Sequence, residues 1–136
     1  MSTGRSLVTQ LTDKLIGHAL TGSRPTSPTD GVDLAAWKTG GAYGPVSVVI
    51  YFDGTAPAAI AAPAAGSTGV ELWGFSLGLW WLIAVFNAGV AIPIASDSLG
   101  SVEQLDDVGG FERLFVAGTV SSGSASVQFA PLEVLR

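Results

Sequence analysis

The sequence lacks cysteine altogether and contains a single histidine, His18, among its 136 residues. The absence of cysteine excludes disulfides and thiolate metal sites, and one histidine is too few for a multi-histidine metal centre within one chain. A Ser-His-Asp arrangement has no support either, because no recognisable pattern places a nucleophile near His18. We therefore expect a protein that is not an enzyme and that needs no cofactor.

Charged residues are also scarce. Asp, Glu, Lys and Arg make up 12% of the chain against 48% hydrophobic residues, and the mean hydropathy is +0.48. With 11 acidic and 6 basic residues the formal net charge is −5, which argues against partners such as nucleic acid or an anionic membrane surface. Such an apolar balance is unusual for a soluble monomer and is typical of chains that bury surface in an oligomer or a larger assembly.

The longest uncharged stretch lies between Glu71 and Asp97, where the sequence has no ionisable side chain. Its length would suit a membrane-spanning helix. Three glycines interrupt the stretch, however, Pro93 closes it, and the flanking charges are acidic, all of which disfavours such a helix. A pair of buried strands fits the stretch better.

We read this stretch as a hairpin with strands at residues 71–75 and 79–87 and a turn at Ser76-Leu77-Gly78. Strict alternation places Leu79, Trp81, Ile83 and Val85 on one face of the return strand, and Trp80, Leu82, Ala84 and Phe86 on the other. Both faces are apolar, so another sheet, the N-terminal arm or a neighbouring subunit must cover the second one. We expect a homo-oligomer, with a trimer as the first choice.

Residues 1–30 are expected to form an N-terminal arm, and residues 31–136 a β domain. Four aliphatic residues of the arm recur at about a helical turn, which predicts a short amphipathic helix. They are Leu7, Leu11, Leu15 and Ile16. Residues 21–30 contain two prolines and small polar residues, as extended linkers do. The arm is either a frayed terminus or a segment that drapes over a partner, with the aliphatic residues as anchors.

Residues 1–20 have no continuous apolar core, so we expect no secretory signal and synthesis in a cytoplasm.

The rest of the chain predicts several short strands separated by turns. The expected strands are residues 32–37, 46–52, 90–95, 111–120 and 124–130. We expect two surface connections. Residues 56–69 are rich in Ala and Pro, and residues 96–110 contain four acidic residues among small ones. The fold class indicated is all-β, an antiparallel β-sandwich or jelly roll, with a barrel as the alternative.

Two groups of residues invite a binding interpretation. Glu103, Asp106 and Asp107 could supply oxygen ligands for Ca²⁺, but they lack the alternating spacing of a calcium loop, and a solvated loop is the better interpretation. The four tryptophans, Trp37, Trp73, Trp80 and Trp81, either fill a core or interface, or stack on sugar rings. The first reading is favoured because few polar residues lie near them, and Phe86 is a further interface candidate.

Three segments resemble small structural proteins of tailed-bacteriophage virions, and capsid decoration (cement) proteins most of all. They are Glu71-Leu72-Trp73-Gly74-Phe75, then Leu79-Trp80-Trp81-Leu82 with Asn87 following, and Arg113-Leu114-Phe115-Val116-Ala117-Gly118-Thr119-Val120 with its Ser-Ser-Gly turn. The resemblance covers about residues 69–135 and is one of pattern, with no motif of chemical specificity.

What the resemblance implies is a β-rich domain, often trimeric, that binds the outer face of the major capsid protein lattice and braces the shell. The protein would be made in the host cytoplasm and reside in the virion, with itself and the major capsid protein as partners. The alternative is a carbohydrate-binding or receptor-binding module of a phage fibre or spike that uses exposed tryptophans.

Overall fold

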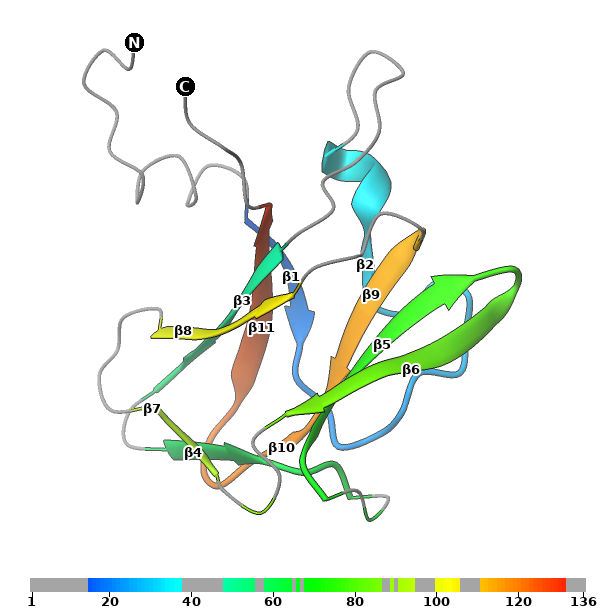
Figure 1. Ribbon diagram of the computed structural model, residues 1–136. Helices are drawn as coiled ribbons and strands as arrows, with labels where there is room; N and C mark the ends of the chain where they lie inside the picture. Colours follow the sequence, from blue (N-terminus) through cyan, green and yellow to red (C-terminus); the bar gives the residue numbers. More distant parts are fainter. Residues whose placement is uncertain are drawn as a thin grey trace, which may run out of the picture.

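The computed structural model describes residues 15–37, 48–55, 58–64, 66, 68–86, 89, 91–94, 100–105 and 111–131. Every pair of neighbouring strands in these ranges is antiparallel, and the one helical segment is a short 3-10 turn, η1 (Leu34–Trp37). The expected all-β antiparallel class is confirmed (Figure 1).

The strands form three sheets (Figure 1). Sheet A has the order β1-β11-β3-β8, made of β1 (Ile16–Ala19), β11 (Ala125–Pro131), β3 (Val48–Gly54) and β8 (Gly100–Leu105). Sheet B has the order β2-β9-β5-β6, made of β2 (Val32–Asp33), β9 (Arg113–Ala117), β5 (Val70–Ser76) and β6 (Leu79–Phe86). Sheet C has the order β10-β4-β7, made of β10 (Thr119–Val120), β4 (Ala58–Ala61) and β7 (Ile92–Ile94).

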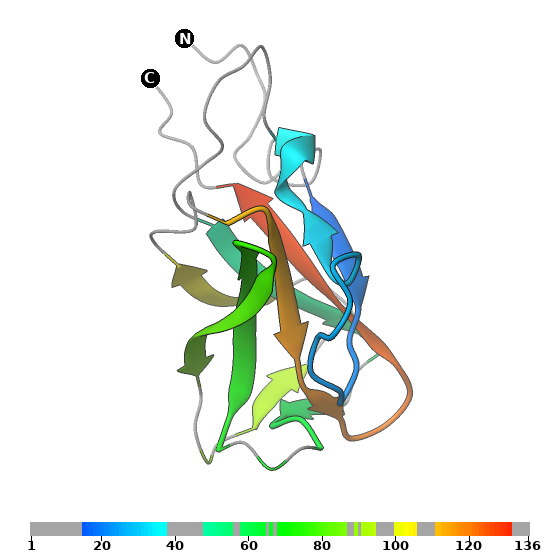
Figure 2. The same ribbon diagram turned by 90° about the vertical axis from the view of Figure 1, so that its right-hand side faces the viewer.

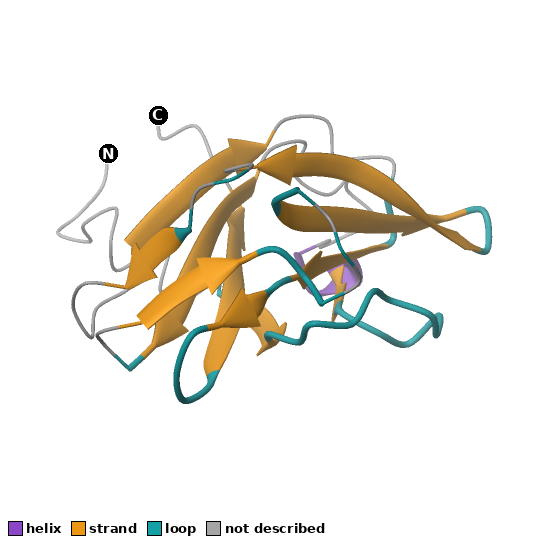
Figure 3. Ribbon diagram, turned by 90° about the horizontal axis from the view of Figure 1, so that it is seen from below, coloured by secondary structure: helices purple, strands orange, loops and turns teal. Residues whose placement is uncertain are grey.

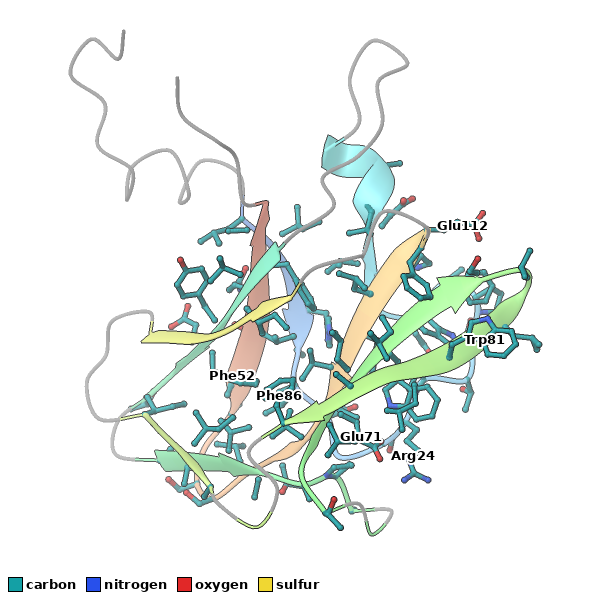
Figure 4. The ribbon with its side chains drawn as sticks, viewed as in Figure 1. Arg24, Phe52, Glu71, Trp81, Phe86 and Glu112 are labelled. Atoms are coloured by element: carbon teal, nitrogen blue, oxygen red, sulfur yellow. The ribbon has the colours of Figure 1, made fainter. Side chains whose placement is uncertain are left out.

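The hydrophobic core draws on all three sheets. In β3, β9 and β11 alternate residues are buried in one cluster, as the two-residue period of a strand requires. The least exposed members are Ile50, Ile60, Leu72, Leu114, Val116, Val127 and Phe129, each at 0%. Each such side chain contributes on the order of 1.5–3 kcal/mol when it leaves water. Phe52 from sheet A and Phe86 from sheet B belong to the same cluster (Figure 4).

The structure corrects the expected helix in the arm. Ile16–Ala19 is strand β1, paired with β11 so that Ile16 lies opposite Phe129; residues 7–14 of the expected helix lie outside the described residues. Four aliphatic positions at about helical spacing are a weak signal, and pairing with a long buried strand outweighs it. Residues 15–30 of the expected arm therefore pair with the sheets or pack on them.

Two expected connections are also corrected. Ala58–Ala61 is strand β4, which pairs with β10 on one side and β7 on the other and buries Ile60 completely. Gly100–Leu105 is strand β8 at the edge of sheet A. The strands expected at residues 46–52 and 124–130 are present as β3 and β11, whereas the one expected at residues 111–120 is divided at Gly118 into β9 and β10.

Candidate interaction surface

All the large hydrophobic side chains that the described residues expose lie on one hairpin, formed by β5, its turn and β6. Their exposed fractions are 88% for Leu77, 57% for Leu79, 49% for Leu82, 46% for Trp81 and 38% for Val85. The hairpin projects from the rest of sheet B (Figures 1 and 3). We call these five residues the hairpin patch.

The turn of the hairpin is strained. Leu77 and Gly78 both have positive φ angles, 56° and 77°, as the two central residues of a type I′ turn do. Glycine adopts this conformation at little cost, whereas the Cβ atom of a leucine clashes there. Leu77 is the one non-glycine residue with positive φ in the described ranges, and its exposed side chain gains little packing in return.

A β-bulge in β6 decides which side chains share a face. Leu82 and Ala84 lie opposite consecutive residues of β5, so Ile83 is an extra residue. Strict alternation predicts Trp81 and Val85 on one face, but the bulge reverses the alternation and moves Val85 to the opposite face. The faces expected from the sequence are therefore wrong beyond Ile83.

The hairpin patch consequently occupies both faces of one strand. Leu79 and Trp81 lie on the face of sheet B that turns toward the core, beyond the point where the core ends, whereas Leu82 and Val85 lie on the outer face. No strand within the described part of the chain pairs with β6 on the side away from β5, because sheet B ends at β6.

The outer face of sheet B around Trp80 is covered by the chain itself. The Trp80 indole Nε1 donates a hydrogen bond to the Ser27 carbonyl oxygen at 2.9 Å, and the Trp80 ring packs against Phe75 and Phe115 at centroid distances of 5.2 Å and 6.1 Å. Figure 2 shows the segment that carries Ser27 running beside β9. The sequence left three possible covers for the second apolar face: another sheet, the N-terminal arm or a neighbouring subunit. Around Trp80 the cover is the N-terminal segment.

The loop that carries Ser27 is held by Asp30. One Asp30 carboxylate oxygen accepts hydrogen bonds from the backbone N–H groups of Thr26 and Ser27, each at 2.9 Å. These bonds lower the pKa of Asp30 below its usual range, because they favour the charged form. The loop is thereby fixed over the sheet.

A buried carboxylate, Glu71, anchors the same segment. Glu71 is 1% exposed and accepts hydrogen bonds from Arg24 Nε at 2.9 Å, Arg24 Nη2 at 2.8 Å and Trp73 Nε1 at 3.0 Å. The bidentate geometry is the strong form of an Arg–carboxylate pair, and the hydrogen bonds raise the pKa of Arg24. The guanidinium also lies 5.9 Å from the Trp73 ring centroid, and Figure 4 shows Arg24 and Glu71 side by side.

Arg113 holds the end of this segment. Its Nε donates to the Asp30 carbonyl at 2.7 Å, and its Nη2 donates to the carbonyls of Thr29 and Gly31 at 2.9 Å and 3.2 Å. Its Nη1 lies 3.7 Å from the Asp33 carboxylate. One guanidinium on β9 therefore satisfies three successive backbone carbonyls.

His18 joins β1 of sheet A to the edge of β9. The backbone N–H of Val116 donates to His18 Nε2 at 3.1 Å, so the ring is neutral with its proton on Nδ1, which lies 2.9 Å from the Ala19 carbonyl. The ring stacks on Phe115 at 4.7 Å and 13°. Burial lowers the pKa of His18, against the opposing effects of the Ala19 carbonyl and the Asp30 charge.

The residues expected to make contacts from sequence are distributed among several environments. Leu7 and Leu11 lie outside the described residues, and so does the side chain of Trp37, whose backbone forms the end of η1. Leu15 is half-buried, Ile16 packs against the core, and Phe86 is a core residue at 8% exposure. The hairpin brings together Trp73, Trp80 and Trp81, of which Trp81 is the exposed one.

Sequence reasoning placed Leu77 in the hairpin turn but did not name it as a contact candidate, and it missed the roles of Arg24 and Arg113. A signal existed for Arg24, since a carboxylate such as Glu71 between buried aliphatic residues requires a cation, although the sequence does not show which one. Leu77 stands where a hairpin turn favours Asn, and that mismatch was visible.

The described residues contain no cluster of metal-binding side chains. No group of three or more His, Asp or Glu side chains among them could hold a metal ion; the acidic residues at 106 and 107 and the Glu103 side chain lie outside the description. An open depression of about 510 Å³ is lined by Asp53, Thr55 and residues 124–126, among others, without a histidine or a basic side chain. None of the described helical residues forms a helix long and apolar enough to cross a membrane.

No protein-family profile matches the chain, and neither a curated protein nor a solved structure matches it. The case for function therefore depends on the hairpin patch and the resemblance seen in the sequence.

Proposed function

We propose that this protein is a structural component of a tailed-bacteriophage virion, namely a capsid decoration protein that binds the outer surface of the major capsid protein lattice and stabilises the shell. The observation that carries the proposal is the hairpin patch, five exposed large hydrophobic residues gathered on one projecting element. Apolar surface concentrated in this way marks a protein–protein contact. The proposed fold is a β-sandwich of sheets A and B, and the proposed working form is a homo-oligomer.

Leu77 is the proposed anchor to the shell. It combines a strained backbone with an 88% exposed side chain, and both costs are offset when the side chain enters an apolar pocket of a partner. Its position at the tip of the hairpin gives it the reach for such a contact (Figure 1).

The test is attachment to particles. Shells that lack the protein are incubated with limiting amounts of purified full-length protein, and occupancy is measured by particle reconstruction. Leu77→Asn is expected to reduce occupancy at least about tenfold, as loss of an interface anchor does. Ala61→Asn, at an exposed position on β4, is the matched control and should attach normally. A wild-type chain found inside the tail tube, or missing from the virion, would overturn the proposal.

A sugar-binding role has less support. The indole N–H groups of Trp73, Trp80 and Trp81 all donate within the chain, to Glu71, Ser27 and Ser76. Trp81 is the candidate stacking platform because it is the exposed one of the three. Quenching of tryptophan fluorescence by a glycan, lost in Trp81→Leu, would favour this alternative over the shell.

A further inference from the structure

The free edge of β6 lacks most of the features that protect sheet edges. Proteins blunt such edges with short strands, charges, proline, bulges or a covering segment. At eight residues β6 is the longest strand in the described ranges, and it contains neither a charged residue nor proline. Within the part of the chain that the structure describes, its one protective feature is the bulge at Ile83, and residues 79–82 before the bulge form a regular edge.

The hairpin patch restricts how a partner can bind. Because Leu79 and Trp81 lie on one face of β6 and Leu82 and Val85 on the other, a partner packed against either face leaves half of the patch in water. A strand added along the edge becomes the cross-strand neighbour of side chains on both faces. The occupant indicated by this distribution is an extended strand.

We infer that this strand is β6 of a second copy of the chain, paired antiparallel and edge to edge about a twofold axis. Two copies of a chain of net charge −5 repel each other over most surfaces, but no ionisable side chain lies between Glu71 and Asp97. All eight residues of β6 are apolar, so no register places like charges opposite one another. The absence of charge on β6 thus allows β6 of one copy to pair with β6 of a second copy.

A twofold contact has a geometric consequence at Leu82. In an isologous interface a residue near the axis meets its own counterpart, and the middle of Leu79–Phe86 falls between Leu82 and Ile83. Leu82 of one copy therefore lies close to Leu82 of the other. The assembly unit is a dimer, in place of the trimer indicated by the sequence, and it carries a Leu77 turn at each end. This inference goes beyond the virion proposal, because it holds for the purified protein alone.

Sedimentation velocity of the purified full chain over a micromolar concentration series tests the inference. The wild type is expected to be a dimer, and Leu82→Lys and Leu82→Glu are each expected to raise its dissociation constant at least about tenfold, because like charges meet near the axis. An equimolar mixture of the two variants should regain the dimer, since opposite charges then face each other. Ala61→Lys, at an exposed strand position away from β6, is the matched control and should remain dimeric.

Leu79→Lys provides a second variant on the other face of β6 and should also dissociate the dimer. Near-ultraviolet circular dichroism verifies that each variant is folded. A monomeric or trimeric wild type would overturn the inference, and so would a folded Leu82→Lys with the wild-type mass, or a mixture of folded charge variants that stays monomeric. Particle attachment is not measured in this experiment, so failure here is distinct from failure of the virion proposal.

Discussion

The two edges of sheet B differ sharply. On the β9 side, the short strand β2 pairs with residues 113 and 114, and beyond β2 the His18 ring accepts the Val116 N–H and Thr21 bridges Ala117. At the β6 edge no described strand or side chain takes an equivalent place.

The chain contains residues that can protect a sheet edge, so a shortage of them does not explain the difference between the two sides of sheet B. It has one histidine and six Lys and Arg residues, and it uses His18, Arg24 and Arg113 to hold residues 15–31 against sheet B. None of its charged residues lies on β6. Among the described residues the β6 edge is therefore uncovered while the opposite side of the sheet is closed, and this contrast supports the proposal that β6 is a contact surface.

Among substitutions on the closed side of sheet B, Gly31→Ala is expected to lower the free energy of unfolding the most. Gly31 has a φ of 72°, and an added Cβ would collide with the Leu114 carbonyl oxygen. We expect a loss of about 3 kcal/mol in the free energy of unfolding, measured with urea. Gly123→Ala is the control, with a φ of 68° and nothing within 4 Å of its Cβ, and should lose only about 1 kcal/mol. Equal losses would show that the close approach to β9 is unimportant.

Arg24→Met should weaken the same side by a smaller amount. It leaves the Glu71 carboxylate buried without its cation, which destabilises a fold, whereas adding Glu71→Gln removes the buried charge and should restore part of the stability. A double-mutant cycle by urea unfolding measures this coupling. Strictly additive losses in the cycle would contradict the proposed dependence of Glu71 on Arg24.

The His18 contact predicts a pH dependence of stability. Burial holds the folded-state pKa below the ordinary value of 6.5, so the unfolded chain takes up a proton first as the pH falls. The stabilisation is complete above 6.5 and is lost progressively below that value, down through the folded-state pKa. Urea unfolding between about pH 7.5 and pH 5 should show this loss in the wild type. His18→Gln keeps a hydrogen-bond acceptor that does not titrate. If the free energy of unfolding depends on pH in this variant as it does in the wild type, His18 is not the group responsible.

The smallest effect is expected at the tip of the open-edged hairpin. Leu77→Asn should stabilise the chain by about 0.5–1 kcal/mol, because Asn tolerates the left-handed conformation that strains leucine. Thermal unfolding at a fixed protein concentration measures the gain, and sedimentation should show an unchanged oligomer. Destabilisation would mean that Leu77 already packs within the single chain.

Local patterns in the sequence predict some strands of this fold and miss others. In β11 the alternation of Ala125, Val127 and Phe129 is visible without any partner strand, and β3 is rich in β-branched and aromatic residues. By contrast, β1 contains Gly17 and His18 and becomes a strand because it pairs with β11 at the far end of the chain. The alanine-rich β4 likewise depends on strands on both sides of it.

The candidate site was predictable to a similar extent. The uncharged stretch identified the hairpin and its turn. The bulge at Ile83, which sets the faces, leaves no sequence signal. The contacts that cover the outer face join residues far apart, 47 positions for Arg24 and Glu71 and 83 for Arg113 and Asp30, and no local pattern reports such pairs.

The pairing of β1 with β11 has a consequence for synthesis. Strand β1 leaves the ribosome before β5 and β6, whereas its partner β11 follows them, so sheet A is completed only after the β5–β6 hairpin has been made. The β5–β6 hairpin needs only its two-residue turn, and hairpins form within microseconds. The apolar hairpin can therefore form on the nascent chain before β11, the strand that completes sheet A, has been made. Under the edge-to-edge pairing of β6 that we propose, nascent chains on neighbouring ribosomes of one messenger can begin to join during translation.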